Sequence, residues 1–303
     1  MCLLMFCVLA VNAQFVTHGR HPSIKHKIDT CNYSVVYYYK FVRDTIQKNE
    51  YFDRQILEVS DSIVKYSSIY ADKIDSVHVA FSNKKNRPNK SGADGYNPGK
   101  EAGMKSNETA IYADYYTNYP RRGVLTVSTG VWGKEYVYEE PIPKFEWKIQ
   151  SDTATILGYK CIKATTTFRG RTYNAWFTLF IPMRYGPWKF SGLPGLILKV
   201  SDTKEYFEWT AIGIEQSRNR SLDIIDFDRI PKSLVRTDRK DVIKLLHKRW
   251  NDPVGLGFAN LSQTFKGSYS ITDPLTGKTA RISYAMPVDK NVQFPYIPIP
   301  ELE

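Results

Sequence analysis

The sequence predicts a mainly β protein: a single curved antiparallel sheet, open and barrel-like, with one or two packed helices. Aromatic residues make up 14% of the 303 residues, and Tyr alone occurs 21 times. Such side chains suit the half-buried surfaces of strands. Between residues 145 and 213, strand-like segments follow one another closely, while only 71–81 and 239–250 carry apolar residues at helical spacing. The hydrophobic content of 42% is sufficient for a packed core.

The first part of the chain alternates short strand-like segments with turn signals. β-Branched and aromatic residues are concentrated in 33–40, 54–59, 63–69, 110–116, 124–128 and 134–138. Ser60-Asp61-Ser62 predicts the turn between the second and third of these segments. In 71–81, apolar residues recur at helical spacing from Ile74 to Phe81, and we expect a short helix there.

The clearest pattern is an antiparallel meander, made of the segments 145–149, 158–168, 171–181, 196–201 and 205–213. Arg169-Gly170 predicts a two-residue hairpin loop, and 202–204 predicts another tight turn. In 171–181, aromatic residues occupy both alternating faces, with Tyr173 and Phe177 on one face and Trp176 and Phe180 on the other. We therefore expect this strand to be covered on both sides.

The C-terminal part contains the strongest helix signal, at 239–250. Asp238 can cap this helix, and Val242 and Leu246 belong to its apolar stripe. We expect 251–278 to be loop-like and 280–284 to add a strand. Three Pro residues predict an extended tail at 294–303.

The N-terminus is typical of an export signal, at residues 1–13. Residues 2–11 form an apolar run too short to span a bilayer, and Val11-Asn12-Ala13 fits a cleavage site, although no Lys or Arg follows Met1. The alternative is a buried N-terminal strand. Because no later apolar run has membrane-spanning length, we expect an exported protein that is not transmembrane. Its location would be the periplasm, the outer-membrane surface or the medium.

The rest of the chain predicts one domain. Residues 14–32 are expected to form a flexible lead, whose three His at irregular spacing predict no specific metal site. Residues 33–303 are expected to form a single β-rich domain. A disordered insertion is expected at about 82–108, because this segment is rich in Gly, Pro and Lys and poor in apolar residues.

The charge and the cysteines leave alternatives open. The net charge of +11 favours anionic partners, although solubility is a simpler explanation, because much of the excess lies in a loop. We expect no nucleic-acid partner. An oxidising compartment would permit a disulfide between Cys31 and Cys161. We favour two unrelated thiols, because Cys31 lies in a polar stretch and Cys161 in a predicted core strand.

The best candidate site is the loop 182–195, which joins two strands through many more residues than a hairpin needs. Rigid turns are predicted by Gly186, Pro187, Gly192, Pro194 and Gly195. The candidate binding residues between and beside these turns are Trp188, Lys189, Phe190 and Leu193. Aromatic and cationic side chains held out by rigid turns suit a sugar ring, an apolar tail or a partner chain. In the alternative, the aromatic residues fold back as a plug over the end of the sheet.

Two arginines form a second candidate site. Arg169 and Arg171 flank the hairpin glycine Gly170, and their guanidinium groups could grip an anion bidentately. The alternative is surface solubility at a turn.

Signals for catalysis are weak in this sequence. It contains no Gly-x-Ser-x-Gly, His-Glu-x-x-His or Cys-x-x-Cys motif and no dinucleotide-binding glycine fingerprint. Only His78 and His247 fall in expected folded segments, and acidic pairs such as Glu139-Glu140 are typical of solvated surfaces. We expect no cofactor and no metal. We favour a non-enzymatic binding role over an envelope hydrolase or transferase that uses carboxylates.

The hexapeptide at 192–197, Gly-Leu-Pro-Gly-Leu-Ile, resembles the signature of the GLPGLI family, an exported family of Bacteroidota. Further segments resemble that family in the same order: 138–140, 145–147, 156–161, 168–171, 175–177, 181–182, 186–188 and 295–303. The resemblance implies an exported protein without an established activity, associated with TonB-dependent outer-membrane uptake. It implies as partner an uptake receptor, or an anionic or apolar ligand of the envelope, and it assigns no catalytic residue.

Overall fold

The computed structural model describes residues 25–42, 48–82, 98–131, 134–225, 234–251, 264–272 and 279–287. The predicted signal at 1–13, the tail at 294–303 and most of the predicted insertion, 83–97, lie outside these residues. In chain order, the described elements are β1 (Lys25–Val42), β2 (Glu50–Val59), β3 (Val64–Ser68), α1 (Ile69–Ser82), α2 (Pro98–Glu101), β4 (Ala113–Thr117), β5 (Val124–Val131), β6 (Lys134–Pro141), β7 (Lys148–Ile156), β8 (Tyr159–Phe168), β9 (Arg171–Thr178), β10 (Leu196–Asp202), β11 (Phe207–Ile225), β12 (Leu234–Arg236), α3 (Arg239–Asn251), β13 (Thr264–Thr272) and β14 (Thr279–Pro287).

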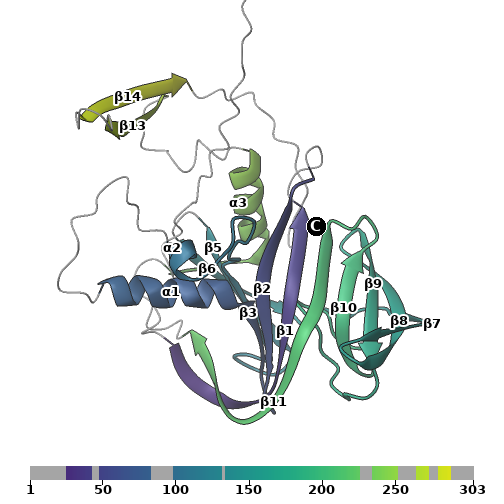
Figure 1. Ribbon diagram of the computed structural model, residues 1–303. Helices are drawn as coiled ribbons and strands as arrows, with labels where there is room; N and C mark the ends of the chain where they lie inside the picture. The colour runs from purple at the N-terminus through teal and green to yellow at the C-terminus, as the bar shows by residue number, and fades with distance from the viewer. Residues whose placement is uncertain are drawn as a thin grey trace, which may run out of the picture.

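Twelve of these strands form one open sheet in the order β12-β6-β5-β4-β3-β2-β1-β11-β10-β9-β8-β7 (Figure 1). All neighbours pair antiparallel except β12 and β6, which run parallel. The strands β13 and β14 pair with each other as a separate hairpin. The predicted fold class, mainly β with a single open sheet and few helices, is confirmed.

The centre of the sheet is the pairing of its two longest strands, β1 and β11. Their partnership extends from Lys25 and Ile225 to Phe41 and Phe207, with three register shifts along the way. Such bulges bend a strand and increase its twist, and both strands curl where β1 begins and β11 ends (Figure 1). Alternate residues of β1, from Val35 to Phe41, are buried in the main core.

Two apolar cores lie against the sheet. The main core contains the buried rings of Tyr37, Trp209 and Phe177, and α3 contributes Val242 and Leu246 to it. The expected apolar stripe of this helix is therefore the face that it buries. A smaller second core includes Cys31, Tyr116, Val137, Leu222 and Ile224.

Several local predictions were wrong. Residues 25–32, expected to be flexible, begin β1, and 98–108 of the expected insertion is folded, since it contains α2 and a bridge between Phe52 and Glu108. The strand β13 occupies part of the expected loop 251–278. Strand β9 ends at Thr178, before residue 181, and the expected cover over both its faces does not extend to Phe180, which is 73% exposed.

Two observations bear on the cysteines and on membranes. Cys31 and Cys161 are both buried and free, as the interpretation that they are two unrelated thiols predicts.

No helix among the described residues combines the length and the apolar character that crossing a membrane requires.

Candidate functional site

The loop 182–195 lies against the main core and is fixed there by backbone hydrogen bonds. The amides of Leu196 and Ile197 donate to the carbonyls of Ile181 and Tyr185, both at 3.0 Å, and the amide of Gly192 donates to the carbonyl of Arg184 at 2.9 Å. Trp188, Phe190 and Leu193 are 6%, 1% and 1% exposed. Their side chains therefore face the core, as in the plug alternative, and are not held out into solvent.

The glycines of the loop explain its tight fit. A Cβ on Gly195 would lie 1.9 Å from the carbonyl oxygen of Thr178, and one on Gly186 would lie 2.8 Å from the Cβ of Ile197. Gly192 has a φ of +98°, which side chains rarely adopt. Trp188 itself has a φ of 53°, a conformation that costs about 1–2 kcal/mol and must be offset by its contacts.

Aromatic stacking supplies those contacts. The ring of Trp188 lies parallel to that of Trp209, with centroids 6.1 Å apart, and meets Phe190 edge to face at 5.2 Å. Phe190 also meets Tyr173 at 4.9 Å. Trp147 closes the outer side, where its Nε1 donates a hydrogen bond of 2.8 Å to the carbonyl of Ser191.

Lys189 is the polar anchor of the loop. Its side chain is 0% exposed, and its Nζ lies 2.5 Å from an oxygen of Glu140. The same Nζ lies 5.5 to 5.7 Å from the ring centroids of Trp188, Tyr115 and Tyr138. An ammonium ion within about 6 Å of aromatic faces is stabilised by them, so the loop is held by an ion pair inside an aromatic cage.

The arginines of the β8–β9 hairpin bind carboxylates of this chain. Arg169 donates to Glu140 at 2.8 Å, and Arg171 donates to Asp202 at 2.9 Å while it lies over the ring of Phe207. Arg239 Nε, at the start of α3, lies 3.5 Å from Glu140. Both arginines of the hairpin point inward to carboxylates on other elements. They therefore do not bind an anion together, and they do not lie free in solvent at the turn.

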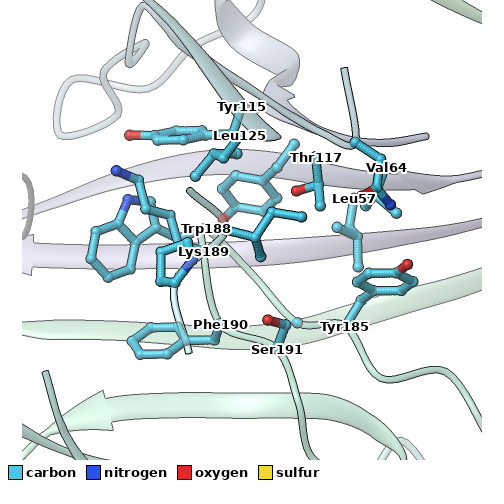
Figure 2. Close-up of a pocket in the computed structure, with 15 residues that line it drawn as sticks. Leu57, Val64, Tyr115, Thr117, Leu125, Tyr185, Trp188, Lys189, Phe190 and Ser191 are labelled. Atoms are coloured by element: carbon cyan, nitrogen blue, oxygen red, sulfur yellow. The ribbon is translucent and has the colours of Figure 1, made fainter. Parts of the chain in front are cut away.

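A cavity of about 90 Å³ opens between this loop and the strands β2 to β5 (Figure 2). Its apolar and aromatic wall is made by Leu57, Val64, Tyr66, Tyr115, Leu125, Ile142, Pro143, Gly186, Trp188 and Phe190. Its polar lining residues are Thr117, Asn118, Tyr185, Ser191 and Lys189. Among the described residues, no Asp, Glu or His lines this cavity. Three residues of the sequence-predicted site, Trp188, Lys189 and Phe190, thus belong to one wall, while Leu193, Arg169 and Arg171 do not line it.

A second polar feature lies under α1, outside the cavity. Asp53 is 0% exposed, and its carboxyl oxygens accept hydrogen bonds from Ser68 Oγ at 2.8 Å and Gln55 Nε2 at 3.1 Å. Burial raises the pKa of Asp53 to about 8, although these hydrogen bonds act in the opposite direction. Ser68 Oγ also accepts from the amide of Ala71, so Asp53 supports the N-cap of the helix.

Sequence reasoning missed the opposite wall of the cavity and the role of Glu140. The adjacent Glu139 and Glu140 predict a solvated pair, but Glu139 faces outward to Arg121 and Glu140 faces inward. The alternation of β6 carried the signal, because Tyr136, Tyr138 and Glu140 share one face. Among the described residues, no group of three His, Cys, Asp or Glu is placed to hold a metal ion.

Comparison with known proteins gives one partial family match. A family model described as "N-glycanase peptide, N-terminal domain" matches residues 127–231. No curated protein matches the sequence significantly. Two solved structures of PNGF-II, in the P21 and C2 space groups, are similar with 14% identity and a TM-score of 0.44 each, over 80% and 81% of this chain. The chain spans 35% of the length of either structure.

Proposed function

We propose that the protein is an exported, non-enzymatic binding protein of the cell envelope, with its ligand site in the cavity beneath the loop 182–195. The observation that carries this proposal is the lining. Aromatic and apolar residues form most of the wall, and the polar residues Thr117, Asn118, Tyr185 and Ser191 complete it. A mostly apolar pocket with a few placed polar groups is the usual form of a small-ligand site.

The ligand class we propose is a glycan, bound through one sugar ring. A sugar presents an apolar face of C–H groups, which packs on aromatic rings, and a rim of hydroxyls, which bond to polar side chains. At about 10–15 Å³ for one water, the cavity of about 90 Å³ has room for roughly six to nine waters. This space suits a single ring. The partial match to the N-terminal domain of an N-glycanase supports the same class of ligand.

The lining favours binding over the alternative of a carboxylate-dependent hydrolase or transferase. A general acid or base must lie within hydrogen-bond reach of the reacting group. Within the part of the chain that the structure describes, the lining residues include neither a carboxylate nor an imidazole, and the amine of Lys189 is paired with Glu140.

The test is a substitution at the polar rim whose side chain fills the cavity and leaves the core residues unchanged. Thr117 is half-buried at the end of β4 and projects into the cavity (Figure 2). Thr117→Trp is expected to abolish binding to a glycan identified by array screening and measured by calorimetry. Thr172→Trp, at an exposed strand position that does not line the cavity, is the matched control and should bind normally. Equal binding by both variants would reject the cavity as the site, and a glycan screen without a hit would reject the ligand class.

The GLPGLI-type signature supports a place in an envelope uptake system, which we include in the proposal. We expect the protein in the periplasmic or outer-membrane fraction, or in the medium. Affinity capture from an envelope extract should enrich a TonB-dependent outer-membrane receptor with wild-type protein. Recovery of the protein only from the cytoplasm would contradict export, and capture without such a receptor would contradict the link to uptake.

A further inference from the structure

Large apolar side chains are exposed at one end of the sheet. Among the described residues, Leu157, Leu179 and Phe180 are 44%, 54% and 73% exposed. Leu157 lies in the turn between β7 and β8, and the other two directly follow β9. We call these three residues the apolar tip.

The strand registers place the members of the apolar tip at the same edge. Ile156 pairs with Tyr159 around the turn that contains Leu157, and Ile162 of β8 pairs with Phe177 of β9. The turn and the end of β9 therefore lie at the same end of neighbouring strands. The backbone of the tip is attached to the sheet, since Ile181 is buried and the amide of Phe180 donates to Thr178 Oγ1 at 3.3 Å.

Positive charge accompanies the apolar tip. Lys160, at the start of β8, and Arg184, in the loop, are exposed. Neither forms an ion pair with a carboxylate in the described ranges; Arg184 donates to the carbonyl of Gly192 at 3.0 Å. Half-buried Tyr159 and Tyr185 stand beside these cations in the sequence. Because Ile162 pairs with Phe177, the same register places Lys160 beside Leu179. Exposed apolar side chains next to a cation match the chemistry of an anionic lipid surface.

We propose that the apolar tip is a membrane-docking site that inserts into the headgroup region of an anionic bilayer. Leu179 and Phe180 supply the apolar contact, and Lys160 and Arg184 supply attraction to lipid phosphate. Three exposed side chains make a small contact, whereas a stable protein interface buries about 800 Å² per partner, so a lipid surface fits the tip better than a protein partner. The site is independent of the proposed glycan cavity, whose lining includes none of the three tip residues.

The test is co-sedimentation of the protein without its predicted export signal at 1–13, mixed with vesicles of phosphatidylethanolamine and phosphatidylglycerol. The Leu179→Ser/Phe180→Ser double variant is expected to bind at least about tenfold more weakly than wild type, because its apolar contact is lost. Ile149→Ser is the matched control, since Ile149 is 55% exposed at the far end of β7, and it should bind like wild type. Lys160→Ser should weaken binding about fivefold at low salt.

Circular dichroism will show that each variant is folded. The proposal is overturned if wild-type protein does not co-sediment with these vesicles, if neutral phosphatidylcholine vesicles bind it equally well, or if the double variant binds as tightly as the control. Loss of a protein partner by the double variant, without any vesicle binding by wild type, would reassign the tip to a protein interface.

Discussion

Gly195→Ala is the substitution that tests most directly how the loop 182–195 is held. A Cβ at this position would lie 1.9 Å from the carbonyl oxygen of Thr178, whereas real Cβ atoms do not approach within 3.0 Å. The loop and the end of β9 would have to separate by about 1 Å. This separation breaks the hydrogen bond from the Leu196 amide to Ile181 and loosens the packing of Leu193. Strain and a lost buried hydrogen bond together predict a loss of about 3–5 kcal/mol in the free energy of unfolding.

The assay is urea unfolding, followed by tryptophan fluorescence, with Gly213→Ala as the matched control. Nothing lies within 4 Å of a Cβ on Gly213, and its φ is not in the left-handed region. The control should therefore change stability by less than about 0.5 kcal/mol or raise it slightly. If Gly195→Ala unfolds within 0.5 kcal/mol of wild type, the close approach is not what requires glycine, and the argument fails.

Three further predictions concern buried polar groups. The pKa of Asp53 is raised from 3.8 to about 8 in the folded protein, so its contribution to stability is fully present below about pH 4 and is lost as the pH rises to 8. In urea titrations at several pH values, Asp53→Asn should remove up to about 1.4 kcal/mol per pH unit of this pH dependence. An unchanged dependence of the unfolding free energy on pH would refute the role of Asp53. Glu140→Gln should lower the melting temperature more than Lys189→Met, because Glu140 is shared by three cations while Lys189 is one of them; the reverse order would contradict this role. Cys31 and Cys161 should react with a thiol reagent only after denaturation, since both are buried and burial raises both pKa values; fast labelling of native protein would show otherwise.

Local features of the fold could be predicted from the sequence. The Arg169-Gly170 hairpin joins β8 and β9 as expected, and the predicted helix at 239–250 corresponds to α3. Both are set by residues close together in the chain, where turn chemistry and periodicity act.

Long-range pairing could not be predicted in this way. Strands β1 and β11 are the centre of the sheet, yet about 170 residues separate Tyr37 from its partner Ala211. Hydrophobic alternation shows which face a strand buries, but it does not identify the neighbouring strand. The wall of the cavity formed by Tyr66 and Tyr115 depends likewise on the pairing of β3 with β4, and only the loop wall could be located from the sequence.

The direction of the loop side chains was likewise undetermined. Rigid turns around Trp188 and Phe190 are compatible with display outward or with packing inward, and the choice depends on Trp209 and Tyr173, which lie on other strands. In the structure the rings of Trp188 and Phe190 pack inward, and the same rings form one wall of the cavity. Replacing Trp188 would therefore alter stability and binding together. Rim positions such as Thr117 separate the two effects, since a side chain there can fill the cavity while the stacked rings stay in place.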